Sequence, residues 1–159
     1  MDSDHNKTII IASDHNGNAA RNYINKLFGG GRTLVDHGPT EEQGKADYPV
    51  QAAKVCRSLI SCFQLGDPDA IGILICGTGT GMCIAANSFK EIRAALVTDR
   101  ATAALAREHN NANVLVLGQW RTPLSQMEEI VQTFLDTPYG GGRHDKRLEM
   151  LRSLRDGHL

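Results

Sequence analysis

The sequence predicts a three-layer αβα sandwich, an α/β fold in which helices cover both faces of a five-stranded parallel sheet. Along the 159 residues, short β-branched apolar runs alternate with longer segments of helical periodicity. The clearest run, Ala70–Cys76 (AIGILIC), is apolar throughout, as expected for a parallel strand buried on both faces. Because no repeat, low-complexity stretch or long linker divides the chain, residues 1–159 are expected to form one domain.

Five apolar runs predict the strands of this sheet. They are of strand length, and they are rich in the β-branched residues that suit a pleated, buried surface. Each of them is followed by a segment of helical periodicity, which favours parallel pairing. The predicted strands are Thr8–Ser13, Thr33–Asp36, Ala70–Cys76, Arg93–Val97 and Val114–Gly118.

Helical periodicity and helix end signals predict six helices. Three glycines, Gly29–Gly31, end the first helix, and Pro49 suits the first turn of the second. A further break at Gly140–Gly142 precedes the last helix, and Pro39–Tyr48 is expected to be a polar loop. The predicted helices are Asn18–Phe28, Pro49–Leu65, a short Ala-rich segment that ends near Ser88, Ala101–His109, Pro123–Asp136 and Arg143–Arg155.

The composition argues against several functional classes. With 17 basic and 18 acidic side chains, the chain lacks the basic surplus that nucleic acids and anionic membranes require. No apolar run approaches the ~20 residues of a membrane span, and Met1–Lys7 lacks the apolar core of a signal peptide. The four cysteines suggest neither a disulfide framework nor a zinc site. We therefore expect a soluble, cytoplasmic protein without a metal.

Polar side chains gather where a ligand site is expected. In a doubly wound sheet, ligands bind beyond the carboxyl ends of the strands. Asp14 and His15 follow the first predicted strand. Cys76 is the last residue of the third predicted strand, and the glycine-rich segment Gly77–Gly81 follows it. Thr98 and Asp99 follow the fourth. The sequence therefore predicts a site at this edge of the sheet.

The glycine-rich turn Cys76–Gly81 (CGTGTG) suits an anion. Alternating glycines between a strand and a helix let backbone N–H groups converge on a negative charge. A Walker A loop is excluded because Met82 and Cys83 follow Gly81, and the dinucleotide fingerprint would need a glycine at position 82. A tight turn without a ligand remains the alternative.

Cys76 at the start of this turn is a candidate base or nucleophile. A helix N-terminus and nearby amide donors favour a thiolate, and Thr78 offers a hydroxyl group to a substrate oxygen. Alternatively, Cys76 only continues the buried strand, as free cysteines often do. Cys56, Cys62 and Cys83 are expected to be buried fillers.

Three further side chains are candidate site residues, and two of them, Asp14 and His109, also have a structural interpretation. Asp14 can accept hydrogen bonds from sugar hydroxyls, or it can cap the first helix. His15 can donate to a phosphate or a hydroxyl group. His109 can act as a general acid and base, or it can interact with the C-terminus of its helix.

The start of the last helix carries a local cluster of positive charge. Arg143 and Arg147 are four residues apart and therefore share a helix face, with His144 beside them. Two guanidinium groups on one face suit a phosphate group. A solvated face balanced by nearby acidic side chains is the alternative.

Taken together, these motifs closely resemble type B ribose-5-phosphate isomerases, whose family also includes isomerases of galactose 6-phosphate and allose 6-phosphate. The resemblance runs in order from about residue 8 to residue 155 and implies a Rossmann-like, flavodoxin-like sandwich. The motifs are ASDHNG (Ala12–Gly17), DYP (Asp47–Pro49), ICGTGTGMCIAAN (Ile75–Asn87), REHNNAN (Arg107–Asn113) and GGRHDKR (Gly141–Arg147).

The resemblance implies an isomerase that interconverts D-ribose 5-phosphate and D-ribulose 5-phosphate, a step of the pentose phosphate pathway, without a metal or an organic cofactor. His109, helped by Asn110, would open the furanose ring, and the Cys76 thiolate would move a proton from C2 to C1. Thr78 and the backbone N–H groups of the turn would stabilise the enediolate. The implied substrate-binding residues are Asp14, His15, Tyr48, Gly77, Gly79, Gly81, Asn110, Arg143, His144 and Arg147.

The resemblance also implies a homodimer with shared active sites. His109 and the C-terminal arginines would come from the other subunit, with the last helix (about 143–155) reaching across. Pairing of dimers into tetramers stays open.

The chain departs from the family pattern at two positions. Met82 stands where some members have a glutamate base, and Trp120 stands where many have an arginine, with Arg121 next to it as a candidate substitute. Two alternatives to a pentose phosphate isomerase remain. One is an isomerase of a 6-phosphohexose such as allose 6-phosphate, and the other is a non-catalytic module that binds phosphate or nucleotides.

Overall fold

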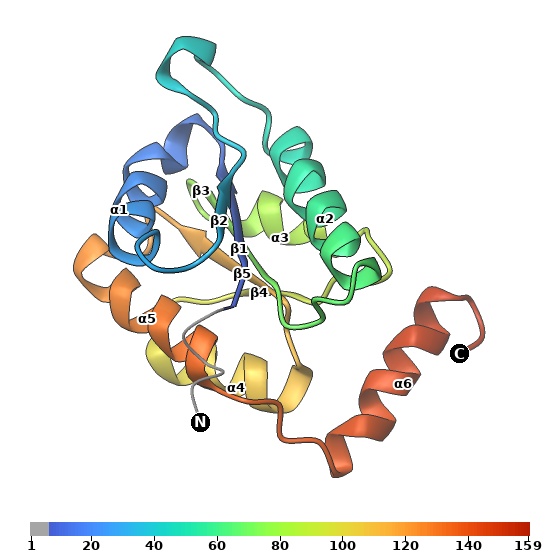
Figure 1. Cartoon of the computed structure of the whole chain (residues 1–159). Coiled ribbons are helices and arrows are strands. Elements are labelled where there is room, and N and C mark those ends of the chain that lie inside the picture. Colours follow the sequence, from blue (N-terminus) through green and yellow to red (C-terminus); the bar gives the residue numbers. More distant parts are fainter. Residues whose placement is uncertain (1–6) are drawn as a thin grey trace.

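The computed structural model describes residues 7–159 and contains a five-stranded sheet in which all strands are parallel (Figure 1). The strand order is β2-β1-β3-β5-β4. The strands are β1 (Ile9–Ser13), β2 (Leu34–Asp36), β3 (Ile71–Cys76), β4 (Ala94–Leu96) and β5 (Val114–Gly118). The sequence predicts that Met1–Lys7 is not a signal peptide. Except for Lys7, this segment lies outside the described residues.

Six α-helices accompany the sheet. They are α1 (Asn18–Phe28), α2 (Tyr48–Gln64), α3 (Thr80–Ala86), α4 (Arg100–Asn110), α5 (Leu124–Asp136) and α6 (Arg143–Arg155). Two short 3₁₀-helices, η2 (His15–Gly17) and η3 (Glu41–Gln43), lie in the connections. Within residues 7–159, no helix combines the length and the apolar character that crossing a membrane would need.

The sheet separates two apolar cores. Ile9 and Ile11 face the core under α1, α4 and α5, whereas Ile10 and Ala12 face the core under α2 and α3. This alternation follows from the two-residue period of a strand, and both sets are nearly inaccessible to solvent. The predicted three-layer fold is therefore confirmed.

The strand order changes direction between β1 and β3. From β1 the chain first crosses to β2 on one side, and it then returns to β3 on the other side. In the register of the sheet, Ser13 lies opposite Ile75, and Cys76 lies opposite Gly118. The first and third loops therefore start side by side at the switch point, where ligands of such sheets bind.

Most element bounds differ from the sequence-based expectation by a residue or two, and the differences near the carboxyl edge of the sheet matter most. Helix α3 already begins at Thr80, so Gly81 lies inside the helix and not in the turn, because Gly79 adopts a left-handed conformation (φ 83°) and starts the helix early. The expected polar loop at 39–48 contains η3. A capping box between Thr40 and Gln43 caps the N-terminal end of η3. Helix α2 starts one residue early, at Tyr48.

Helix α6 stands apart from the rest of the molecule (Figure 1). Near its start the His144 ring stacks on His109, and near its end Arg155 donates hydrogen bonds to the carbonyl groups of Phe89 and Lys90. Between these contacts, apolar side chains such as Met150 remain exposed. An exposed apolar helix face of this kind indicates a surface that another chain can cover.

Candidate active site

Asp14 lies at the end of β1 and is held by the backbone on both sides. Its N–H group donates to the Ile75 carbonyl at 3.1 Å, and its Oδ1 accepts from the Asn16 N–H group at 2.9 Å. Asp14 therefore caps η2 and not α1, whose N-cap is Gly17. Among residues 7–159, Oδ2 has no hydrogen-bond partner. This oxygen remains free to accept a bond from a ligand.

Gly17 fixes the distance between this first loop and β3. A Cβ atom at Gly17 would lie 2.6 Å from the Ile75 carbonyl oxygen, which is closer than atoms can approach. Only glycine therefore allows the loop after β1 to rest directly on the last residues of β3.

Cys76 ends β3 with its side chain directed at the turn that follows. Its Sγ accepts a hydrogen bond from the Gly79 N–H group at 3.1 Å, and only 6% of the residue is exposed. An amide donor aimed at the sulfur stabilises the thiolate more than the thiol. The geometry therefore favours the interpretation of Cys76 as a base over that of a mere strand residue.

The other three cysteines lack this setting. Burial raises the pKa of the Cys56 thiol to about 12. Burial also raises the pKa of Cys62, helped by the charge of Asp67, and that of Cys83. The expectation that all three are buried holds for Cys56 only, since Cys62 and Cys83 are half-buried. Both lie on helices whose outer flanks reach the surface.

Aromatic rings lie against Gly77 of the turn and against Gly81 in the first turn of α3. A Cβ atom at Gly77 would lie 2.7 Å from the Trp120 ring, and one at Gly81 would lie 2.9 Å from the Tyr48 ring. Any larger residue would push these rings away. Tyr48 is among the residues that the resemblance implies for the site, whereas Trp120 is a departure from the family pattern.

Two contacts between loops accompany these ring positions. The Trp120 N–H group donates to the Gly77 carbonyl at 2.9 Å, which keeps the loop after β5 on the turn. A ring nitrogen of His15, Nδ1, lies 3.3 Å from the Ala46 carbonyl oxygen, just before Tyr48. The carboxyl edge of the sheet thus brings together Asp14, His15, Tyr48, Cys76, Gly77, Thr78, Gly79 and Gly81.

Met82 contributes no polar group to this site. Its side chain points into the core under α2 and α3 and is inaccessible to solvent. Position 82 therefore supplies no carbon base in this chain. The described residues also contain no group of His, Cys, Asp and Glu side chains that could hold a metal ion.

The remaining predicted residues lie at the opposite, amino edge of the sheet. Helix α4 runs back against the strands, and the Asn113 carbonyl that follows it bonds to Gly72 at the start of β3. His109 and Asn110 therefore lie about the length of β3 away from Cys76. Figure 1 shows α6 starting beside the end of α4 at this edge.

At the amino edge the two histidines and two arginines form one cluster. The His109 and His144 rings stack with their centroids 4.4 Å apart, and Glu108 Oε1 lies 3.9 Å from His109 Nε2. Burial, followed by the positive charges of Arg143, His109 and Arg147, lowers the pKa of His144, and Glu108 opposes this shift. Neither Arg143 nor Arg147 has an ion-pair partner among residues 7–159. The cluster is positive and open to an anion.

These features define a doubly wound α/β protein in which the Cys76 thiol and a glycine-rich turn lie at the switch point of the sheet. Comparison with known proteins narrows this class. The sequence profile of the Ribose/Galactose Isomerase family matches residues 9–151, and the chain belongs to this family. The resemblance noted in the sequence is therefore confirmed, and the chain belongs among the isomerases.

Individual relatives agree with this assignment. The chain is 43% identical over 144 residues to a probable ribose-5-phosphate isomerase B of Mycoplasma pneumoniae, covering 90% of this chain and 91% of the relative. It is 37% identical over 149 residues to ribose-5-phosphate isomerase B of Escherichia coli, covering 93% and 96%. It is also similar to a crystal structure of ribose-5-phosphate isomerase B from Mycoplasma genitalium with bound ribulose-5-phosphate. The TM-score is 0.85 at 39% identity, with 94% of this chain and 96% of that chain covered.

Proposed function

We propose that this protein interconverts D-ribose 5-phosphate and D-ribulose 5-phosphate, with Cys76 as the carbon base. The observation that carries the proposal is the Gly79 N–H group 3.1 Å from Cys76 Sγ, at the start of a helix. The relatives named for this reaction support the choice of substrate.

The chemistry needs one base that reaches two neighbouring carbons. In the open-chain aldehyde, the Cys76 thiolate removes the C2 proton, and the electrons flow through a C1–C2 double bond onto O1. The resulting enediolate passes its O2 proton to O1, regains the original C2 proton at C1 from the Cys76 thiol and becomes the ketone, which restores the thiolate. Thr78 and backbone N–H groups of the turn stabilise the charged oxygen.

Asp14, His15 and Tyr48 bind the sugar in this proposal. The free Oδ2 of Asp14 accepts from a sugar hydroxyl, and the exposed His15 ring lies at the rim of the site. Tyr48, which is 42% exposed, covers the turn from the side of α2. Asp14 and His15 belong to the segment after β1, whereas Tyr48 is the first residue of α2, so the side chains approach the substrate from two directions.

A second copy of the chain completes the site. Because His109, Asn110, Arg143, His144 and Arg147 lie at the opposite edge, one chain alone does not bring a ring-opening acid and a phosphate anchor to Cys76. We infer a homodimer in which α6 reaches the partner's carboxyl edge. Both surfaces carry exposed apolar side chains that such contact would cover, among them Ile84, Trp120 and Leu154.

The proposal includes the cell compartment and the pathway. Four free thiols suit a reducing environment such as the cytoplasm. The reaction connects an aldopentose phosphate with its ketose and thus belongs to pentose phosphate metabolism.

The test is formation of ribulose 5-phosphate from ribose 5-phosphate by the purified protein in the presence of EDTA, with allose 6-phosphate in parallel. We expect turnover of the pentose that EDTA does not reduce. Reaction of the hexose alone would keep the mechanism and refute the named substrate. Inactivity of folded protein toward both sugars would refute the isomerase proposal and favour a binding module.

A 6-phosphohexose is the second candidate substrate, because the matching family covers both ribose and galactose isomerases. Trp120 bears on this choice, since its ring occupies the space beside Gly77 where an arginine of other members would reach a phosphate group. Arg121 next to it is exposed and is the candidate substitute. The parallel hexose assay distinguishes the two substrates directly.

A further inference from the structure

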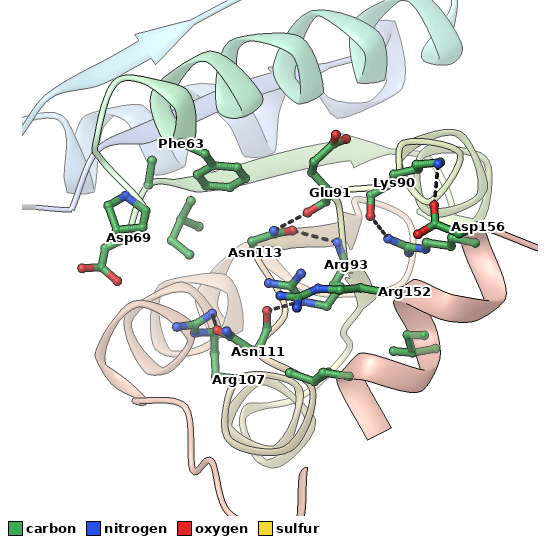
Figure 2. Close-up of a pocket in the computed structure, with 16 residues that line it drawn as sticks. Phe63, Asp69, Lys90, Glu91, Arg93, Arg107, Asn111, Asn113, Arg152 and Asp156 are labelled. Atoms are coloured by element: carbon green, nitrogen blue, oxygen red, sulfur yellow. Dashed lines mark hydrogen bonds and ion pairs between the residues drawn. The ribbon is translucent and has the colours of Figure 1, made fainter. Parts of the chain in front are cut away.

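A second positively charged region lies in a pocket of about 540 Å³ between α6 and the body of the molecule (Figure 2). Four arginines line it, and they come from three separate segments. Arg93 precedes β4, Arg107 belongs to α4, and Arg152 and Arg155 belong to the last turns of α6. The whole chain carries a net charge of −1, so this concentration of positive charge is a local feature.

Arg93 lies at the centre of the pocket and is only partly paired. Its Nε donates to the Asn111 carbonyl at 2.8 Å, while its terminal nitrogens have no acceptor among residues 7–159. Burial and the neighbouring charges of Arg152, Arg155 and Arg107 lower the pKa of this guanidinium group, and only Tyr139 opposes them. A half-buried cation among like charges is unfavourable unless an anion joins it.

The acidic side chains near the pocket do not neutralise its centre. Asp156 pairs with Lys90, and Glu149, which does not line the pocket, pairs with Arg152 at 3.1 Å; both ion pairs are exposed to solvent. Figure 2 shows the Glu91 carboxylate pointing away from the arginines, and the charge of Asp69 acts on Arg107 and not on Arg93. The polar space between Arg93 and Arg152 therefore remains electropositive.

The remaining walls suit a small organic molecule. Phe63 and Ile71 line one side, and Leu148 and Leu151 of α6 line another. The volume falls within the ~300–1,000 Å³ of small-molecule sites, which combine apolar walls with a few convergent polar groups. Guanidinium groups bind phosphate oxygens in pairs, so a phosphate group fits between Arg93 and Arg152.

We propose that this pocket binds a small phosphorylated molecule at a site separate from the Arg143 and Arg147 cluster. Arg143 and Arg155 lie on the same helix, but twelve residues of helix separate them by about 18 Å. The bound phosphate would join α6 to the body through Arg93 and Arg152. The two ends of α6 would then serve two different anions.

Calorimetric titration with pyrophosphate tests the proposal. The parent protein is the full chain carrying Arg143→Gln and Arg147→Gln, which removes the other phosphate anchor. At low ionic strength we expect saturable binding of one pyrophosphate per chain. Adding Arg152→Glu or Arg93→Gln should weaken this binding at least about tenfold, the effect of losing one charge-assisted hydrogen bond.

Arg100→Gln is the matched control, because Arg100 is an exposed arginine that pairs with Glu129 outside this pocket. It should leave the affinity unchanged. The Arg152 side chain is 71% exposed, so Arg152→Glu is expected to fold, and circular dichroism checks this. Absence of binding to the parent protein would overturn the proposal. So would an affinity that Arg152→Glu does not change, or that Arg100→Gln reduces equally.

Discussion

The two edges of the sheet hold their functional groups in different ways. At the carboxyl edge, backbone hydrogen bonds fix Asp14 and Cys76, and each residue is only 6% exposed. At the amino edge, Arg143 and Arg147 are exposed side chains on a helix that stands away from the body. Proton transfer depends on placement to within a fraction of an ångström, whereas long flexible side chains can adapt to a phosphate group. The rigid edge therefore suits proton transfer at carbon, and the exposed arginines of the other edge suit anchoring of a phosphate group.

The largest expected effect tests the rigid edge. Cys76→Ala should lower kcat by about 10³-fold with little change in KM, because a general base acts in the transition state and not in binding. Steady-state kinetics with ribose 5-phosphate measures this. Cys83→Ala is the matched control, since Cys83 is half-buried on α3 and contacts the Ala94 carbonyl instead of the turn. Normal turnover by Cys76→Ala would remove the thiol from the mechanism.

Mixing subunits tests whether the two edges meet. Cys76→Ala and His109→Ala proteins should each be inactive, because each lacks one half of every shared site. After exchange of subunits at equal amounts, random pairing makes half of the dimers mixed, and each mixed dimer has one intact site. Activity should therefore rise to about a quarter of the wild-type value. If activity stays absent after mass spectrometry has verified subunit exchange, the shared-site arrangement is wrong.

A substitution in the turn tests how rigid the carboxyl edge is. Gly79 has φ 83°, and a Cβ atom there would lie 2.4 Å from a methyl group of Leu96. Gly79→Ala should lower the free energy of unfolding by ~1–3 kcal/mol through backbone strain. Urea denaturation measures this change. Gly30→Ala should have an effect within ~0.5 kcal/mol, because its Cβ atom would meet open space. Equal effects of the two substitutions would show that the turn is not constrained.

The smallest expected effect concerns the charge of the amino edge. Burial and the charges of Arg143, His109 and Arg147 lower the pKa of His144 below its ordinary value of 6.5. The unfolded chain therefore binds more protons at this residue, so its contribution to stability is present above pH 6.5 and is lost as the pH falls through the folded pKa.

Removing one of these charges should move the titration. In Arg143→Gln, the pKa of His144 should rise toward 6.5, which NMR titration of the ring protons measures. Arg100→Gln, on another face, should leave the titration unchanged. An unmoved pKa in Arg143→Gln would show that Arg143 points away from the ring.

Much of the fold could be predicted because its signals are local. The expected bounds of α1, β5 and α6 agree with the structure to the residue. Apolar periodicity marks α1, a continuous apolar run marks β5, and the glycines at 29–31 and 140–142 mark the end of α1 and the start of α6. The start of α3 was wrong because the left-handed conformation of Gly79 depends on how the turn meets Leu96, a contact between distant segments.

The site could be predicted only in part, for the same reason. Cys76 and the glycine turn occupy one continuous segment that follows a recognisable strand. The stacking of Trp120 on Gly77 joins residues that are 43 positions apart, and nothing near Trp120 in the sequence indicates it. The spacing of eleven residues from His109 did mark Trp120 as unusual. Arg93 and Arg152 are separated further still, so their shared pocket has no sequence pattern at all.

The contact between Gly17 and the Ile75 carbonyl limits how this enzyme can change during evolution. Backbone lies directly on backbone there, so the spacing between the Asp14 carboxylate and the Cys76 thiol leaves no room for adjustment by side-chain substitution. A descendant that acts on a longer or shorter sugar must keep this spacing and vary what surrounds it. The variable parts are the loop at 39–47, the ring at position 120 and the helix that carries Arg143. New specificities are therefore expected to arise at the periphery, around an unchanged pair of loops.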